Sequence, residues 1–205
     1  VSLFADVVPQ GPFYPGILLA ILLPTIPAFG LASLLHALGT VAAVRWLARL
    51  RGASEEAACL AGAAVAAGPL GVAAALDAQV DAWPAFLWLP VVLGCMEQLS
   101  RGPGERPDGA RAAQQSGAHR ARRLRWFAFG AGAVALLILG SHLRVAAAAC
   151  AALGLWAVIR GRDVPTTLAM LGLGVLAGAP GFVPMLLESR IDAVASPLAA
   201  LYEPA

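Results

Sequence analysis

Long apolar runs separated by short polar turns organise most of the chain, and they predict membrane-spanning helices. A helix needs roughly 20 apolar residues to cross about 30 Å of hydrocarbon, and the 205 residues have room for about six such helices. We expect them at 28–50, 55–75, 83–96, 126–140, 145–159 and 166–187. The predicted fold class is all-α: a multi-pass helical membrane protein with about six transmembrane helices.

Local signals define several of these helices. Ser54 suits an N-cap, with Glu55 and Glu56 in the first turn, where the helix dipole favours acidic side chains. The Gly68-Pro69 pair predicts a kink or break in the second span, and Pro90 predicts a kink in the third. The fourth and fifth spans are short, so we expect them to be tilted or to lie where the bilayer is thin.

The two ends of the chain differ from the spans. Residues 1–27 contain five prolines and one short apolar run at 17–23, which is too short to span. We therefore expect 1–27 to be an interfacial segment on the outer face, forming the end of an outer loop. Residues 188–205 are more polar, and they predict the start of an extracytoplasmic region.

One long polar stretch, 101–125, interrupts the apolar pattern. It holds seven arginines against Glu105 and Asp108, a net charge of +5 in a chain whose total is +2. Its Gly, Pro, Ser and Gln content without apolar periodicity predicts a mobile loop. A nucleic-acid patch would need interleaved aromatic residues or a known binding fold, which this stretch lacks. We favour a topology signal that also touches membrane lipid, with no nucleic-acid partner.

Composition and charge then orient the chain. Hydrophobic residues make up 60%, charged residues 13%, and the mean hydropathy is +0.77, far from the soluble average of about 25% charged residues. The segments 45–51, 101–125 and 160–162 hold 12 of the 14 arginines, and six spans place all three on one side. Cytoplasmic loops carry an excess of basic residues, so this side is predicted to be the cytoplasm.

Small residues in the spans favour packing roles over chemistry. Residues 172–177 match the dinucleotide pattern GxGxxA, but no strand precedes them. Gly174 and Gly178 also form GxxxG, which predicts close helix packing. Cys59, Cys95 and Cys150 are scattered without metal-ligand spacing, so we expect them to be packing residues and predict no metal site from them.

The remaining candidates for chemistry are few. His36 lies inside a span, where it is either a functional group or, as we favour, a neutral histidine bonded to a neighbouring helix. Asp77 and Asp81 are four residues apart, a spacing open to a metal or acid/base pair, although Asp81 also suits an N-cap. The predicted outer face also holds a further set that could bind a phosphate and position a hydroxyl: His142, Arg144, Glu188 and Arg190. The span centres contain no Asp, Glu, Lys or Arg, which argues against ion-driven transport.

Four stretches carry a family resemblance. They are ADVVPQGPFYPGILLAILLP at 5–24, LLHALGTVAAVRWLARLRGASEEAACLAGA at 34–63, AWPAFLWLPVVLGCME at 82–97 and GAPGFVPMLLESR at 178–190. In this order they resemble the YfhO-like bacterial membrane proteins, which are multi-pass proteins of the GT-C glycosyltransferase type. The resemblance covers nearly the whole chain apart from the arginine-rich stretch.

The resemblance implies a function and a location. The chain would be the membrane module of a glycosyltransferase in the bacterial cytoplasmic (inner) membrane, using a polyprenyl-phosphate-linked sugar to modify a cell-envelope polymer or lipid at the outer face. In GT-C enzymes an Asp of the first outer loop is the typical base, and cationic groups or a divalent metal steady the leaving phosphate. The alternative is a non-catalytic membrane subunit or a lipid or polysaccharide transporter.

The same resemblance places the site residues. Residues 5–24 match the end of the first outer loop, so the first span and the catalytic Asp are expected before Val1, and Asp6 is the acidic residue left in that loop. His142 lies in GSHLR, where relatives often show a GHPQ-like motif, and its neighbours depart from that motif. Glu188 and Arg190 match the family pattern, and the family would continue beyond Ala205. The chain is thus expected to be an interior fragment, inactive alone.

Overall fold

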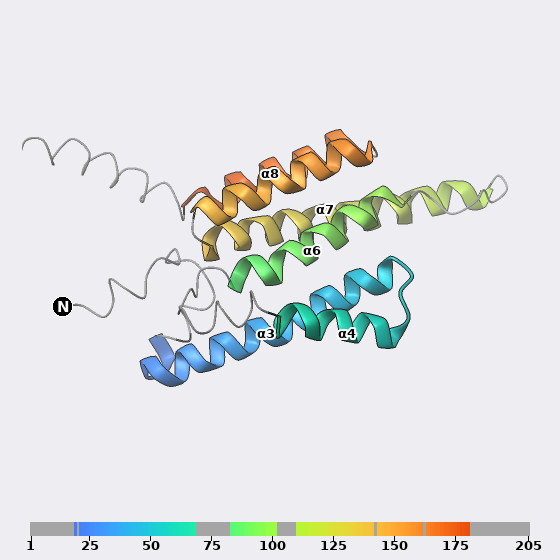
Figure 1. Ribbon diagram of the computed structural model, residues 1–205. Coiled ribbons are helices and arrows are strands. Elements are labelled where there is room, and N and C mark those ends of the chain that lie inside the picture. The colour runs from blue at the N-terminus through green and yellow to red at the C-terminus, as the bar shows by residue number, and fades with distance from the viewer. Residues whose placement is uncertain are drawn as a thin grey trace, which may run out of the picture.

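The helices of the computed structural model follow the apolar runs of the sequence (Figure 1). The structure describes residues 19, 21–68, 83–101, 110–141, 143–161 and 163–180, and all regular elements within them are α-helices. These are α3 (Thr25–Leu50), α4 (Glu55–Ala66), α6 (Trp83–Ser100), α7 (Ala110–Gly140), α8 (Leu143–Arg160) and a last helix over Val164–Pro180. The predicted all-α class is confirmed.

Within the described residues, two helices are long and apolar enough to cross a membrane: Ile26–Leu50 and Gly117–Gly140. Val145–Arg160 and Val164–Pro180 are apolar but shorter. The 12 residues of α4 extend about 18 Å at 1.5 Å per residue, less than the hydrocarbon thickness. The break predicted at Gly68-Pro69 is confirmed, since α4 ends at Ala66. The predicted continuation to residue 75 lies outside the described residues.

The prediction of a loop over 101–125 is wrong for its second half. α7 begins at Ala110 and continues through the arginines into the apolar span without interruption. The physical reason is composition: alanine, arginine and glutamine are strong helix formers, and an isolated Gly117 costs only about 1 kcal/mol. The prolines and most glycines of the stretch are confined to 102–109, which lie outside the described residues.

The core is built around α6, which packs against α3 on one side and α7 on the other, while α4 packs on α3. Val92 and Cys95 of α6 are fully buried, as are Val134 and Leu137 of α7. Met170 of the last helix joins the same apolar cluster. Pro90 lies inside α6 without ending it.

Close helix packing at the GxxxG pair is confirmed. A Cβ added at Gly174 would lie 2.5 Å from Val134 Cβ and 2.7 Å from the Ala131 carbonyl oxygen of α7. A Cβ at Gly178 would lie 2.9 Å from Ile138 Cβ. Real carbon atoms do not approach this closely, so the last helix can contact α7 only because these positions lack side chains.

The helices alternate in direction. α3, α6 and α8 run towards one end of the bundle, on the right of Figure 1, and α4, α7 and the last helix run away from it. We call this end the arginine end because the described arginine side chains gather there: Arg45, Arg49, Arg51, Arg101, Arg120, Arg122, Arg123, Arg125 and Arg160. The described residues of the three arginine-bearing segments thus lie at one end of the bundle, and their placement on one side of a membrane stays a prediction.

Candidate functional site

The predicted outer-face candidates fall almost entirely outside the described residues. This applies to six of them: Asp6, Asp77, Asp81, His142, Glu188 and Arg190. Arg144 lies in the first turn of α8, at the end of the bundle opposite to the arginine end. The structure therefore places the backbone of Arg144 at the end opposite to the arginine end, and the proposed outer-face site stays a prediction.

His36 is a buried residue of α3. Its Nδ1 lies 2.7 Å from the Ala32 carbonyl oxygen one turn earlier, and the Thr40 hydroxyl donates to the His36 carbonyl at 2.8 Å. Buried polar groups are usually hydrogen-bonded in this way. This geometry favours a structural role for His36. The hydrogen bond to Ala32 lies within α3, and the predicted bond to a neighbouring helix stays a prediction.

The turn between α3 and α4 forms one part of the arginine end. The Ser54 side chain accepts a hydrogen bond from the Ala57 N–H at 3.2 Å, which confirms the predicted N-cap. Arg45 Nε donates to Glu55 Oε1 at 2.6 Å, and Arg49 Nε lies 3.3 Å from Glu55 Oε2. The hydrogen bond from Arg45 lowers the pKa of Glu55 below its ordinary value. These side chains are half exposed, so their ion pairs fix the turn but add little stability.

A second set of polar contacts links the remaining helices. Arg122 of α7 donates to Gln98 Oε1 of α6 at 2.7 Å. Arg123 of α7 lies 3.1 Å from Asp163 Oδ1, at the start of the last helix. Arg101 donates to the Leu50 carbonyl oxygen and so caps α3. The arginines of this end therefore connect helices that are distant in sequence.

The pair between Arg160 and Glu97 is the least exposed ion pair of this end. Arg160 Nη1 lies 3.5 Å from Glu97 Oε2, and the Glu97 side chain is only 14% exposed. No hydrogen bond satisfies that carboxylate oxygen within the described residues. Arg160 is consequently the charge that compensates Glu97, because a buried carboxylate without a partner is costly.

Tryptophans lie directly beside these charges. The rings of Trp46 and Trp126 are stacked with centroids 5.7 Å apart. The guanidinium carbons of Arg51 and Arg160 lie 5.8 Å and 5.0 Å from the centroid of Trp156. Tryptophan is enriched at the level of lipid headgroups, where its ring is apolar and its N–H can stay hydrated. This combination of tryptophan and arginine is typical of a membrane–water interface.

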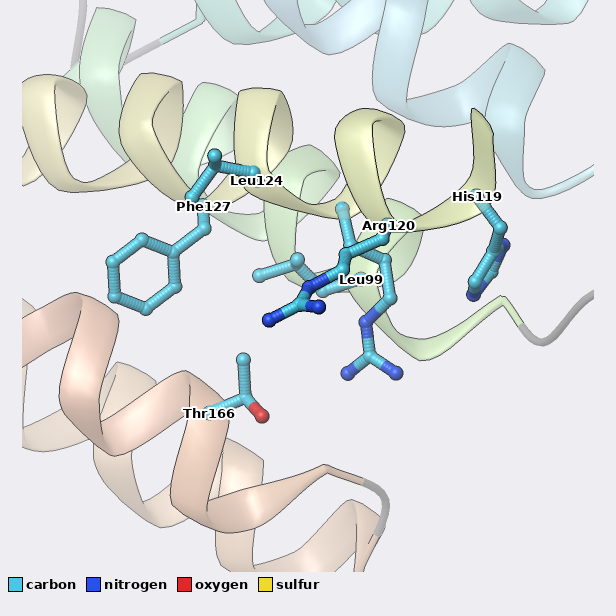
Figure 2. A pocket seen from close by; sticks show the side chains of 7 residues that line it. Leu99, His119, Arg120, Leu124, Phe127 and Thr166 are labelled. Carbon is cyan, nitrogen blue, oxygen red and sulfur yellow. The ribbon is translucent and has the colours of Figure 1, made fainter. Parts of the chain in front are cut away.

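An open cavity of about 540 Å³ lies at the arginine end, between α7 and the last helix. Its lining combines polar and apolar side chains: Leu99, His119, Arg120, Arg123, Leu124, Phe127 and Thr166. Figure 2 shows Arg120 and Phe127 extending from α7 towards the helix that carries Thr166. His119 lies on α7 at the edge of the cavity that is farther from Phe127. Its size falls within the range of about 300–1,000 Å³ found for ligand pockets. The cavity is the candidate site that the described part of the chain offers for a ligand with both polar and apolar groups.

The sequence contained a signal for this cavity that depends on α7 being helical. Arg120, Arg123, Leu124 and Phe127 are spaced three, four and seven residues apart, so they share one face of a helix. In a loop, residues at that spacing do not share a face, so the prediction of a loop over 101–125 hid the cavity. Thr166 and Leu99 come from distant segments, and no local pattern connects them to α7.

Metal ligands do not gather in this part of the molecule. Within the described residues no group of three or more His, Cys, Asp or Glu side chains is placed to hold a metal ion. Cys59, Cys95 and Cys150 are free thiols, and Cys95 lies buried in the core, as expected of a packing residue.

Comparison with known proteins found no family model, no curated protein and no solved structure that matches this chain.

Proposed function

We propose that the chain is a multi-pass helical module of a bacterial inner membrane, with its arginine end in the cytoplasm. The gathering of arginines at one end of an alternating helical bundle, beside Trp46, Trp126 and Trp156, carries this proposal. An excess of arginine marks the cytoplasmic side of membrane proteins, and tryptophan marks the interface. Two helices of sufficient length and apolarity support the same reading.

The module is proposed to belong to a GT-C glycosyltransferase that uses a polyprenyl-phosphate-linked sugar at the outer face. The support is the resemblance of four stretches to YfhO-like proteins, together with a topology that puts Arg144 opposite to the arginine end. At that face a carboxylate would take the proton of the acceptor hydroxyl while cations stabilise the departing phosphate. The residues offered for this work are the predicted candidates Asp6, Asp77, Asp81, His142, Arg144, Glu188 and Arg190.

A transfer assay tests the enzymatic part of the proposal. The full-length protein in proteoliposomes would be supplied with polyprenyl-phosphate sugars and a cell-envelope lipid acceptor, and sugar transfer would be followed by mass spectrometry. Transfer that is lost in Glu188→Gln and retained in Glu56→Gln, at the arginine end, is the expected result. Translocation of labelled lipid without transfer, across a panel of donors, would instead support a transport role and contradict the transferase.

A further inference from the structure

The residues that line the cavity at the arginine end have no role in the sugar transfer proposed for the outer face. One part of its lining is polar, with the guanidinium groups of Arg120 and Arg123 and the imidazole of His119, and another part is apolar, with Leu124 and Phe127. Such a lining matches neither a purely polar metabolite nor a purely apolar one. It matches a molecule with an anionic head and a hydrocarbon tail.

The two arginines of the cavity differ in whether an acidic side chain already pairs with them. Arg123 lies 3.1 Å from Asp163, so much of its charge is already compensated. Arg120 is exposed and forms no ion pair within the described residues. Arg120, assisted by His119, is therefore the group available to an incoming anion, and an arginine fork suits phosphate oxygens.

The apolar side of the cavity is also open. Leu124 is 67% exposed, although it borders Phe127 and the nearly fully buried Leu99. Phe127 follows Arg120 by seven positions, which is about 10 Å along a helix, from the charged part of α7 into its apolar part. An acyl chain lying on Leu124 and Phe127 would thus continue from a phosphate held at Arg120.

We propose that this cavity binds an anionic phospholipid, with its phosphate at Arg120 and His119 and an acyl chain against Leu124 and Phe127. The proposal rests on the membrane location proposed above and does not depend on glycosyl transfer. Trp126, stacked on Trp46 one residue before Phe127, places the cavity at headgroup level. Charge complementarity to the anionic cytoplasmic leaflet selects the lipid class.

Native mass spectrometry of the purified full chain in detergent tests the proposal. Phosphatidylglycerol would be titrated against phosphatidylcholine with the same acyl chains, and inorganic phosphate would be added as a competitor. We expect selective binding of phosphatidylglycerol, weakened about fivefold by Arg120→Gln because one arginine near an anionic lipid contributes about 1 kcal/mol. Leu124→Gln, a substitution at an exposed site, should weaken lipid binding as well.

Arg125→Gln is the matched control, since it removes the same charge from the same helix outside the cavity. It should leave the affinity unchanged. An equal loss in Arg120→Gln and Arg125→Gln, or no preference over phosphatidylcholine, would overturn the site. Displacement of the lipid by inorganic phosphate would show a simple anion site and overturn the lipid assignment. The transfer assay detects a failure of sugar transfer, and that result does not bear on the lipid site. If the protein proved soluble without detergent, its proposed membrane location would be wrong.

Discussion

The ion pairs at the arginine end differ in how much they contribute to stability, because they differ in burial. Glu55 is exposed and has two arginine partners, whereas Glu97 is mostly buried and depends on Arg160. An exposed ion pair is screened by water and adds little stability. Loss of one partner from a buried ion pair leaves a buried charge without compensation. We therefore expect the two glutamates to respond differently to the loss of their arginine partners.

Arg160→Gln is expected to lower the free energy of unfolding by about 1–3 kcal/mol, because the Glu97 carboxylate loses its compensating charge. The measurement is chemical denaturation of the detergent-solubilised protein. Arg125→Gln, an exposed arginine on α7, serves as the control and should have little effect. In the double variant Arg160→Gln/Glu97→Gln much of the stability should return, and equal effects of Arg160→Gln and Arg125→Gln would contradict the pairing.

We expect the stability difference between the wild type and Glu55→Gln to depend on pH. Its pKa is lowered in the folded state by the hydrogen bond from Arg45, so its contribution is present above the pKa of the unfolded state. That contribution is lost as the pH falls through the folded-state pKa. The melting temperatures of the wild type and Glu55→Gln should differ slightly at neutral pH and converge as the pH falls below the unfolded-state value of about 4.3 and through the lowered folded-state pKa. Glu56→Gln is the neighbouring control, and a difference that persists in acid would argue against the Arg45 contact.

At the scale of the helices, the contact between the last helix and α7 depends on missing side chains. Gly174 faces Val134 and the Ala131 carbonyl, while Gly172 on the same helix has no atom within 4 Å of an added Cβ. The two glycines therefore form a matched pair that separates packing from helix propensity.

Gly174→Ala is expected to destabilise the protein by about 1–3 kcal/mol, because the added methyl group overlaps α7. Gly172→Ala should instead be neutral or stabilising by up to about 1 kcal/mol, since alanine is the better helix former. Thermal unfolding of both variants in the same detergent provides the comparison. If Gly174→Ala proved as stable as Gly172→Ala, the described packing of the last helix would be incorrect.

The helices also show which features of the fold were predictable from sequence. Local signals sufficed for the Ser54 cap and the break before Pro69, because each depends on neighbouring residues. The helix over 110–125 was missed because glycine and proline outside this range dominated the interpretation of the whole stretch. The cavity was missed with it, since Leu99 and Thr166 meet α7 only through tertiary packing.

At the scale of the whole molecule, the alternating helices separate two chemically different ends. One end carries the arginines, three tryptophans and the cavity, and the other carries Arg144 and the start of α8. The proposed functions follow from this separation: lipid contact at the arginine end and sugar transfer at the opposite face. Both proposals require that the arginine end lie in the cytoplasm.

Cysteine labelling in intact cells tests that requirement most directly. Cys59, Cys95 and Cys150 would first be replaced, and a single thiol would then be introduced as Gln115→Cys in α7 or as Gln79→Cys in the predicted outer turn. A membrane-impermeant maleimide should label Gln79→Cys in intact cells and Gln115→Cys only after the inner membrane is permeabilised. Labelling of Gln115→Cys in intact cells, with Gln79→Cys protected, would contradict the account.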